Sequence, residues 1–135
     1  MTPSELQRRL DDSPFCRFLG LKLVDADTAR NAVSIAMPMR PELERLARTG
    51  QFHGGAIASL IDIAGDFALV LSVGDAVPTI NYRVDYLRPA HGDAVTARAV
   101  VRRAGRTIGV VDIDVHDGEQ RLIAVGRGCY GTKPG

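Results

Sequence analysis

Two carboxylates in an otherwise apolar stretch are the residues of this sequence best suited to chemistry. Asp62 and Asp66 are four residues apart, so they share one face of the helix that we expect over residues 54–73. Such a carboxylate can attack an electrophile or activate a water, or it can anchor a nearby loop through hydrogen bonds. The residue pattern alone leaves both roles open for Asp62, and for Asp66 we expect a structural or substrate-contacting role.

Two glycines stand where this helix begins. In His53-Gly54-Gly55, the missing side chains let the backbone approach a ligand, and the free amides of the first helical turn point outward. These amides and the helix dipole favour negative charge that develops on a carbonyl oxygen. We therefore expect an anion site built from backbone at Gly54, with His53 either orienting the loop through a hydrogen bond or contacting a substrate.

The segments before this helix supply a helical lead-in and two strands. Thr2-Pro3-Ser4-Glu5 has the form of a capping box, which predicts a short helix to about Leu10, and Ser13-Pro14 starts another turn. Residues 1–19 are thus an N-terminal helical segment. Residues 20–37 predict two antiparallel strands joined by a polar turn near residues 25–31, and residues 40–48 form a charged surface segment.

Four further strands are expected after the helix, at about residues 79–88, 94–103, 107–116 and 121–130. In the third of them apolar and polar side chains alternate, which indicates an antiparallel sheet with one solvated face. The most economical packing is an α+β fold in which a curved antiparallel sheet of about six strands wraps around one long central helix. Residues 1–135 are expected to form a single domain of this kind.

Composition narrows the classes of function. A formal charge of +1 gives no electrostatic case for binding nucleic acid or an anionic membrane. Residues 54–73 are long enough to span a bilayer, but two aspartates and three glycines favour a buried helix. Cys16 and Cys129 have no metal-ligand spacing, and no signal peptide is visible, so we expect a cytoplasmic protein with neither metal nor cofactor.

Three features together resemble the hotdog-fold acyl-CoA thioesterases, and most closely the PaaI-like (phenylacetic acid degradation-type) branch of the 4-hydroxybenzoyl-CoA thioesterase superfamily. They are His53-Gly54-Gly55, an acid nine residues after the His, and the strand from Thr79 that ends in Leu87-Arg88-Pro89. The similarity covers residues 20–130.

The resemblance implies a role for each matching residue. Asp62 would attack the thioester or activate a water, the Gly54 amide would polarise the thioester carbonyl, and Thr79 would help to place the water or the carboxylate. It also implies a homodimer or homotetramer whose sites are shared between subunits, acting on an acyl-CoA with an aryl or medium-chain acyl group.

The sequence departs from the family pattern six residues before His53. Family members often carry Asn or Gln at that position, and this chain has Ala47. Either Gln51, Arg48 or Thr49 takes over that polar contact, or the site lacks one polar contact and its rate or mechanism differs. The second departure is Asp66, which stands where one branch of the family has a hydroxyl residue.

A set of polar or glycine residues near these motifs is expected to contact the substrate. Asn81 is proposed because we expect it on the same strand face as Thr79. The arginines are proposed as a group because guanidinium groups hold coenzyme A phosphates well, although a solvated sheet edge explains any single arginine better. The substrate-binding set is Gly55, Gln51, Asp66, Asn81, Arg88, Arg102, Arg103 and Arg106.

Two other functions fit the same fold. A hotdog dehydratase or hydratase would need a His and an acid placed to move a proton alpha to the carbonyl, and His53 lies at the wrong end of the helix for that. A non-catalytic acyl-CoA-binding protein is disfavoured by the presence of Asp62. Release of free thiol from acyl-CoAs separates hydrolysis from both.

Overall fold

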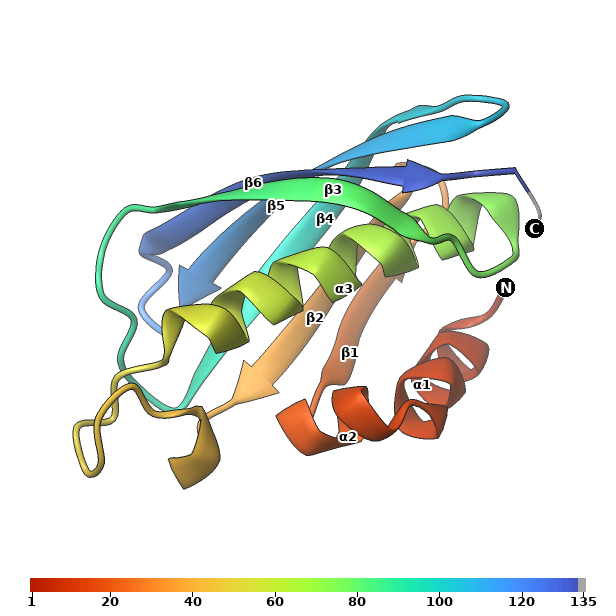
Figure 1. Ribbon diagram of the computed structural model, residues 1–135. Coiled ribbons are helices and arrows are strands. Elements are labelled where there is room, and N and C mark those ends of the chain that lie inside the picture. Colours follow the sequence, from red (N-terminus) through yellow and green to blue (C-terminus); the bar gives the residue numbers. More distant parts are fainter. Residues whose placement is uncertain (134–135) are drawn as a thin grey trace.

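One long helix, α3 (Gly54–Val73), lies in the curve of an antiparallel sheet in the computed structural model of this chain (Figure 1). The structure describes residues 1–133. The six strands lie in the order β1-β2-β4-β5-β6-β3. Their bounds are β1 Lys22–Asp27, β2 Ala32–Pro38, β3 Thr79–Tyr86, β4 Ala94–Ala104, β5 Ile108–Asp117 and β6 Leu122–Gly131. This architecture confirms the predicted hotdog fold.

Two short helices cover the start of the chain, as predicted. In α1 (Pro3–Asp12) the Thr2 hydroxyl accepts from the Glu5 amide and the Glu5 carboxylate accepts from the Thr2 amide, which completes the capping box. The helix runs two residues beyond the predicted end. The second helix, α2 (Pro14–Leu19), begins at the Ser13 cap.

The first hairpin differs from the prediction in the length of its turn. Asp25, Ala26 and Asp27 were placed in a turn because they are polar or small, but they pair with Ser34, Val33 and Ala32 as part of β1. An edge strand can present polar side chains to water without losing its pairing on the other side. The segment before α3 contains only one short 3₁₀ turn, Pro41–Leu43.

The two faces of α3 have different surroundings. Side chains such as Leu60, Ile61 and Ala64 are buried against the sheet. The opposite stripe, which includes Asp62 and Asp66, is only partly covered. Although α3 is long and apolar enough to cross a membrane by length and composition, here it lies along the sheet as a core helix does.

Candidate active site

Asp62 lies on the partly covered face of α3, and two neighbouring strands hold it. The Thr79 hydroxyl on β3 donates to Asp62 Oδ1 at 2.8 Å. The Tyr130 hydroxyl on β6 donates to the Asp62 main-chain carbonyl at 3.0 Å. The structure thus brings Thr79 to Asp62, as the resemblance to the hotdog thioesterases implied, and adds a tyrosine that sequence reasoning missed.

Asp66 is a largely covered carboxyl one helical turn further on. Burial, and secondarily the negative charge of Asp62, raise the pKa of Asp66 from its usual 3.8 to about 7. No hydrogen bond to its carboxyl is formed within residues 1–133. Because the folded chain holds this proton more tightly than the unfolded chain, Asp66 lowers the free energy of unfolding as the pH rises from about 4 to about 7.

The start of α3 leaves one backbone donor free. His53 is the N-cap, and its Nδ1 accepts a hydrogen bond from the Gly55 amide at 2.8 Å. The amides of Ala56 and Ile57 donate to the His53 carbonyl. The Gly54 amide has no acceptor among the described residues, so it is the donor available to a ligand, and His53 orients the loop.

A cleft of about 420 Å³ opens beside Gly54 and is lined partly by Gln51, Tyr86 and Arg88. The Tyr86 hydroxyl donates to the Gly54 carbonyl at 2.6 Å, a contact that the sequence did not predict. The Thr49 hydroxyl is taken up within its own loop by the Leu46 carbonyl. Of the three polar candidates, Gln51 is the one that lines the Gly54 cleft.

Asn81 lies on the opposite side of the sheet from Thr79, so its expected place beside Thr79 is wrong. The register of β3 shifts between these residues, and Thr79 pairs with Tyr130 whereas Asn81 pairs with the adjacent Cys129. Neighbouring residues of one strand point to opposite faces. The bulge at Ile80 therefore directs Asn81 to the outer face, away from Asp62.

The four candidate arginines do not form one cluster in a single chain. Arg88 lies in the Gly54 cleft, whereas Arg103 and Arg106 flank the β4–β5 turn, and Arg102 forms an ion pair with Asp112 at 3.5 Å. Beyond that turn, Gly109 of β5 packs on Leu69 of α3. At about 1.5 Å per residue, Leu69 lies about 22 Å along the helix from Gly54. Arg102, Arg103 and Arg106 therefore lie toward the far end of α3.

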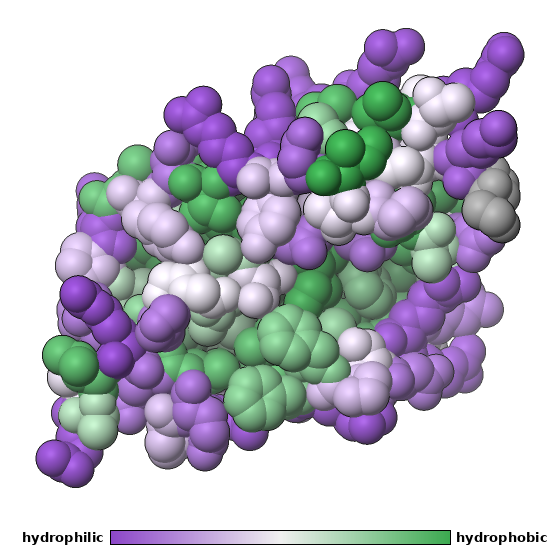
Figure 2. Space-filling view, viewed as in Figure 1, coloured by the Kyte–Doolittle hydropathy of each residue, from purple (hydrophilic) through white to green (hydrophobic). Residues whose placement is uncertain are grey.

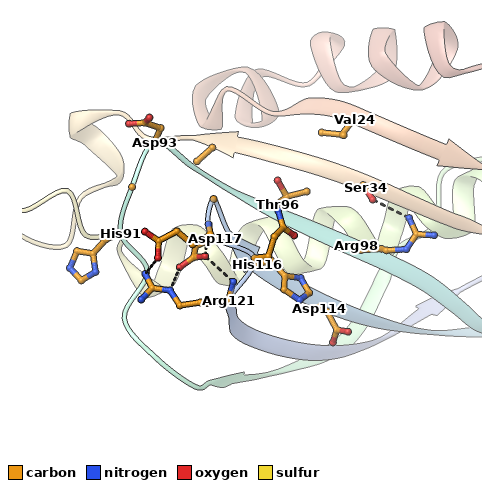
Figure 3. A pocket seen from close by; sticks show the side chains of 15 residues that line it. Val24, Ser34, His91, Asp93, Thr96, Arg98, Asp114, His116, Asp117 and Arg121 are labelled. Carbon is orange, nitrogen blue, oxygen red and sulfur yellow. Dashed lines mark hydrogen bonds and ion pairs between the residues drawn. The ribbon is translucent and has the colours of Figure 1, made fainter.

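Two further hollows differ in character. One, of about 780 Å³, lies on the outer face of the sheet among polar residues such as Asp93, Arg98 and His116 (Figure 3). A cavity of about 460 Å³ lies between the N-terminal helices and α3 (Figure 2), and most of its lining is apolar. Its lining residues include Phe15, Cys16, Ile63, Asp66, Phe67 and Val70.

Within the described residues, no group of three or more His, Cys, Asp or Glu side chains is arranged to hold a metal ion. The groups that line the site are the carboxylates, the helix-start amide and the hydroxyls around them. These groups can deliver an oxygen nucleophile to a carbonyl and stabilise the resulting oxyanion.

Gly54 and Asp62 are too far apart to act on one carbonyl within one chain. Eight residues of helix separate them, which is about 12 Å along the axis. A reacting carbonyl must lie about 3 Å from both the nucleophile and the oxyanion donor. One chain thus carries two halves of a site rather than a complete one.

Comparison with known proteins identifies the class. The sequence model of the Thioesterase superfamily matches residues 49–124, more than half of the chain. A solved protein of this superfamily shares 32% sequence identity and superimposes with a TM-score of 0.89, covering 97% of this chain and 98% of its own. The chain belongs to the thioesterase superfamily, and it is a thioester hydrolase.

Two relatives define the branch. YigI of Escherichia coli K12, a medium/long-chain acyl-CoA thioesterase, is 30% identical, with 87% of this chain and 84% of its own length covered. The PaaI protein from the phenylacetic acid degradation operon of E. coli is 26% identical with a TM-score of 0.81, and 99% of this chain and 97% of its own are covered. This protein is a hotdog-fold acyl-CoA thioesterase of the PaaI-like branch.

Proposed function

We propose that this protein hydrolyses acyl-CoA thioesters with aryl or medium-chain acyl groups, at sites that two copies of the chain build together. The observation that carries the proposal is the placement of Asp62, whose carboxylate is oriented by Thr79 on the accessible face of α3. Within one chain, Gly54 lies about 12 Å along the helix from Asp62, so the Gly54 amide of a second copy would complete the site.

The exposed edge of the sheet supports assembly into a homodimer, with a homotetramer as the larger form. On the described part of the chain, β3 is the last strand of the sheet and presents Ile80 and Tyr82 to solvent. Pairing β3 with its copy would cover this edge. A two-fold axis would also reverse the second α3, so that its Gly54 end lies toward the first copy's Asp62.

The proposed reaction uses each group once. Asp62 either attacks the thioester carbonyl itself or takes a proton from a water that attacks it. The carbonyl π electrons move to oxygen, where the partner's Gly54 amide stabilises the negative charge. The tetrahedral intermediate collapses, the carbon–sulfur bond breaks, and coenzyme A leaves as a thiolate. If Asp62 is the nucleophile, water then hydrolyses the acyl-enzyme anhydride.

The cavity beside Asp66 supports an apolar acyl group. Its volume of about 460 Å³ lies within the usual range of small-molecule pockets, and Ile63, Phe67 and Phe15 provide apolar walls one turn from Asp62. Coenzyme A would extend the other way, through the cleft lined by Gln51 and Arg88. A cytoplasmic location stays a prediction.

Release of free thiol from a panel of aryl- and medium-chain acyl-CoAs tests the proposal. The parent protein should release thiol, and Asp62→Asn should lower kcat by at least the roughly 10²–10⁴-fold contributed by a positioned general base. Light scattering must first show that the variant assembles like the parent. A normally assembled Asp62→Asn protein with kcat within a few-fold of the parent would contradict the role of Asp62, and a larger loss in Asp66→Asn would transfer that role one turn along.

A further inference from the structure

Tyr130 is a buried tyrosine whose hydroxyl reaches the backbone of the proposed catalytic residue. Its side chain is fully buried at the end of β6, beneath α3. The hydroxyl donates to the Asp62 carbonyl at 3.0 Å, in the middle of the helix. A carbonyl at such a position already accepts a hydrogen bond from the amide four residues later, so helix formation alone does not require a second donor.

Glycines make the space for this contact. A Cβ at Gly65 on α3, or at Gly128 on β6, would overlap the Tyr130 phenol. Two different elements therefore lack side chains at the points where the tyrosine ring passes between them. A mid-helix glycine costs about 1 kcal/mol relative to alanine, so Gly65 is a local cost that is offset by a longer-range contact.

Tyr130 and Thr79 hold two different parts of Asp62. They are directly paired across β3 and β6. The Thr79 hydroxyl reaches the Asp62 carboxylate, and the Tyr130 hydroxyl reaches the main-chain carbonyl of the same residue. The side chain and the backbone of Asp62 are thus both hydrogen-bonded to the same cross-strand pair of the sheet.

We propose that Tyr130 is a positioning residue for hydrolysis, which fixes the Asp62 backbone over the sheet so that Thr79 can orient the carboxylate. This inference rests on the proposed function of Asp62. A carboxylate on a helix that shifts or rotates slightly would point away from the reacting carbon, and a misplacement of about 1 Å can cost about 10²-fold in rate.

The hydroxyl is suited to act as a permanent donor. Burial, and then the negative charges of Asp62 and Asp66, raise the pKa of Tyr130 far above its usual value. The phenol therefore keeps its proton at every pH at which the protein works. Any pH dependence of the rate belongs to other groups.

Removal of the single oxygen tests the inference. Tyr130→Phe should lower kcat by up to about 10²-fold, because a carboxylate misplaced by about 1 Å loses about that much rate, while KM stays within about twofold. Thr132→Val is the matched control. Thr132 lies two residues after Tyr130, and the substitution removes a comparable hydrogen bond, 2.6 Å long, from the Thr132 hydroxyl to the Gly105 carbonyl. It should lower the melting temperature similarly and leave kcat unchanged.

A second comparison separates positioning from general packing. Tyr130→Phe introduced into Asp62→Asn should cause no further loss of the residual rate, because the effect acts through the carboxylate. Equal fractional losses in both backgrounds, or a Tyr130→Phe rate within twofold of the parent, would overturn the inference.

A second variant is needed if Tyr130→Phe does not assemble. Gly128→Ala displaces the phenol without removing its hydroxyl, and parental kcat in that variant would equally overturn the inference.

The Asp62→Asn result separates failure of the proposed function from failure of this inference. If Asp62→Asn itself keeps the parental kcat, the proposed function fails. Loss of activity in Asp62→Asn together with a fully active Tyr130→Phe refutes the role of Tyr130 alone.

Discussion

The amide of Gly54 can be removed with little other change to the helix. Gly54 is the first residue of α3, and the preceding His53 has φ −65° and ψ 137°. Proline is favoured at the first position of a helix, and extended backbone is what a residue before proline prefers. Gly54→Pro should therefore keep the helix start while it deletes the one N–H group that the proposed site needs.

Gly54→Ala is the matched control for this substitution. A Cβ at position 54 would lie 3.3 Å from Tyr86 Cζ, which is tight but involves the far end of an exposed side chain. Both variants introduce this contact, and only Gly54→Pro loses the amide hydrogen. The ratio of their kcat values therefore isolates the hydrogen bond to the oxyanion.

The expected ratio follows from known oxyanion sites. Loss of one such donor costs about 10²–10³-fold in kcat, or about 2.7–4 kcal/mol of barrier. Thiol release at saturating acyl-CoA gives kcat for each variant, and circular dichroism and light scattering show whether fold and assembly are kept. A folded, assembled Gly54→Pro with kcat within about threefold of Gly54→Ala would refute the assignment of this amide.

Two further outcomes are expected. The melting temperature of the parent should fall between about pH 4 and 7, because over that range the folded chain keeps the Asp66 proton that the unfolded chain loses. Asp66→Asn should remove this fall, which is worth up to about 4 kcal/mol at 1.36 kcal/mol per pH unit. Parallel melting curves of both proteins across that range would be inconsistent with a pKa of about 7. Arg88→Gln should raise KM for acyl-CoA with kcat nearly unchanged, because Arg88 lines the cleft proposed for coenzyme A and phosphate contacts are alike in the ground and transition states. An unaltered KM would remove Arg88 from the coenzyme A site.

The elements of this fold were predictable because each rests on local pattern. Helix α3 has the predicted bounds since glycines and a capping histidine mark its start and Gly74, in the left-handed region, marks its end. Alternation along β5 predicted its face correctly, with Val111, Ile113 and Val115 buried. Local pattern also identified the Thr2 capping box.

What the sequence did not reveal depends on contacts between distant segments. Nothing in the alternation around Ile80 marks the bulge that turns Asn81 outward. Tyr130 has the appearance of an ordinary strand aromatic until Gly65 and Gly128 are seen on either side of its ring. The packing of α3 on the sheet decides which of these distant residues come into contact. Their spacing along the chain does not show it.

The central claim is that Asp62 and Gly54 of one active site belong to different chains. Asp62→Asn and Gly54→Pro homodimers should each be nearly inactive. When the two proteins are unfolded and refolded together at equal concentration, half of the dimers should be mixed, and each mixed dimer contains one site with both residues intact.

Thiol release by the refolded mixture is the most direct measurement. We expect recovery of about one quarter of the rate of parent protein refolded in the same way, because half of the dimers carry one intact site out of two. Each variant refolded alone should stay inactive. A mixture whose subunits have demonstrably exchanged, yet which is no more active than the two variants alone, would show that both residues act within one chain and would contradict the shared site.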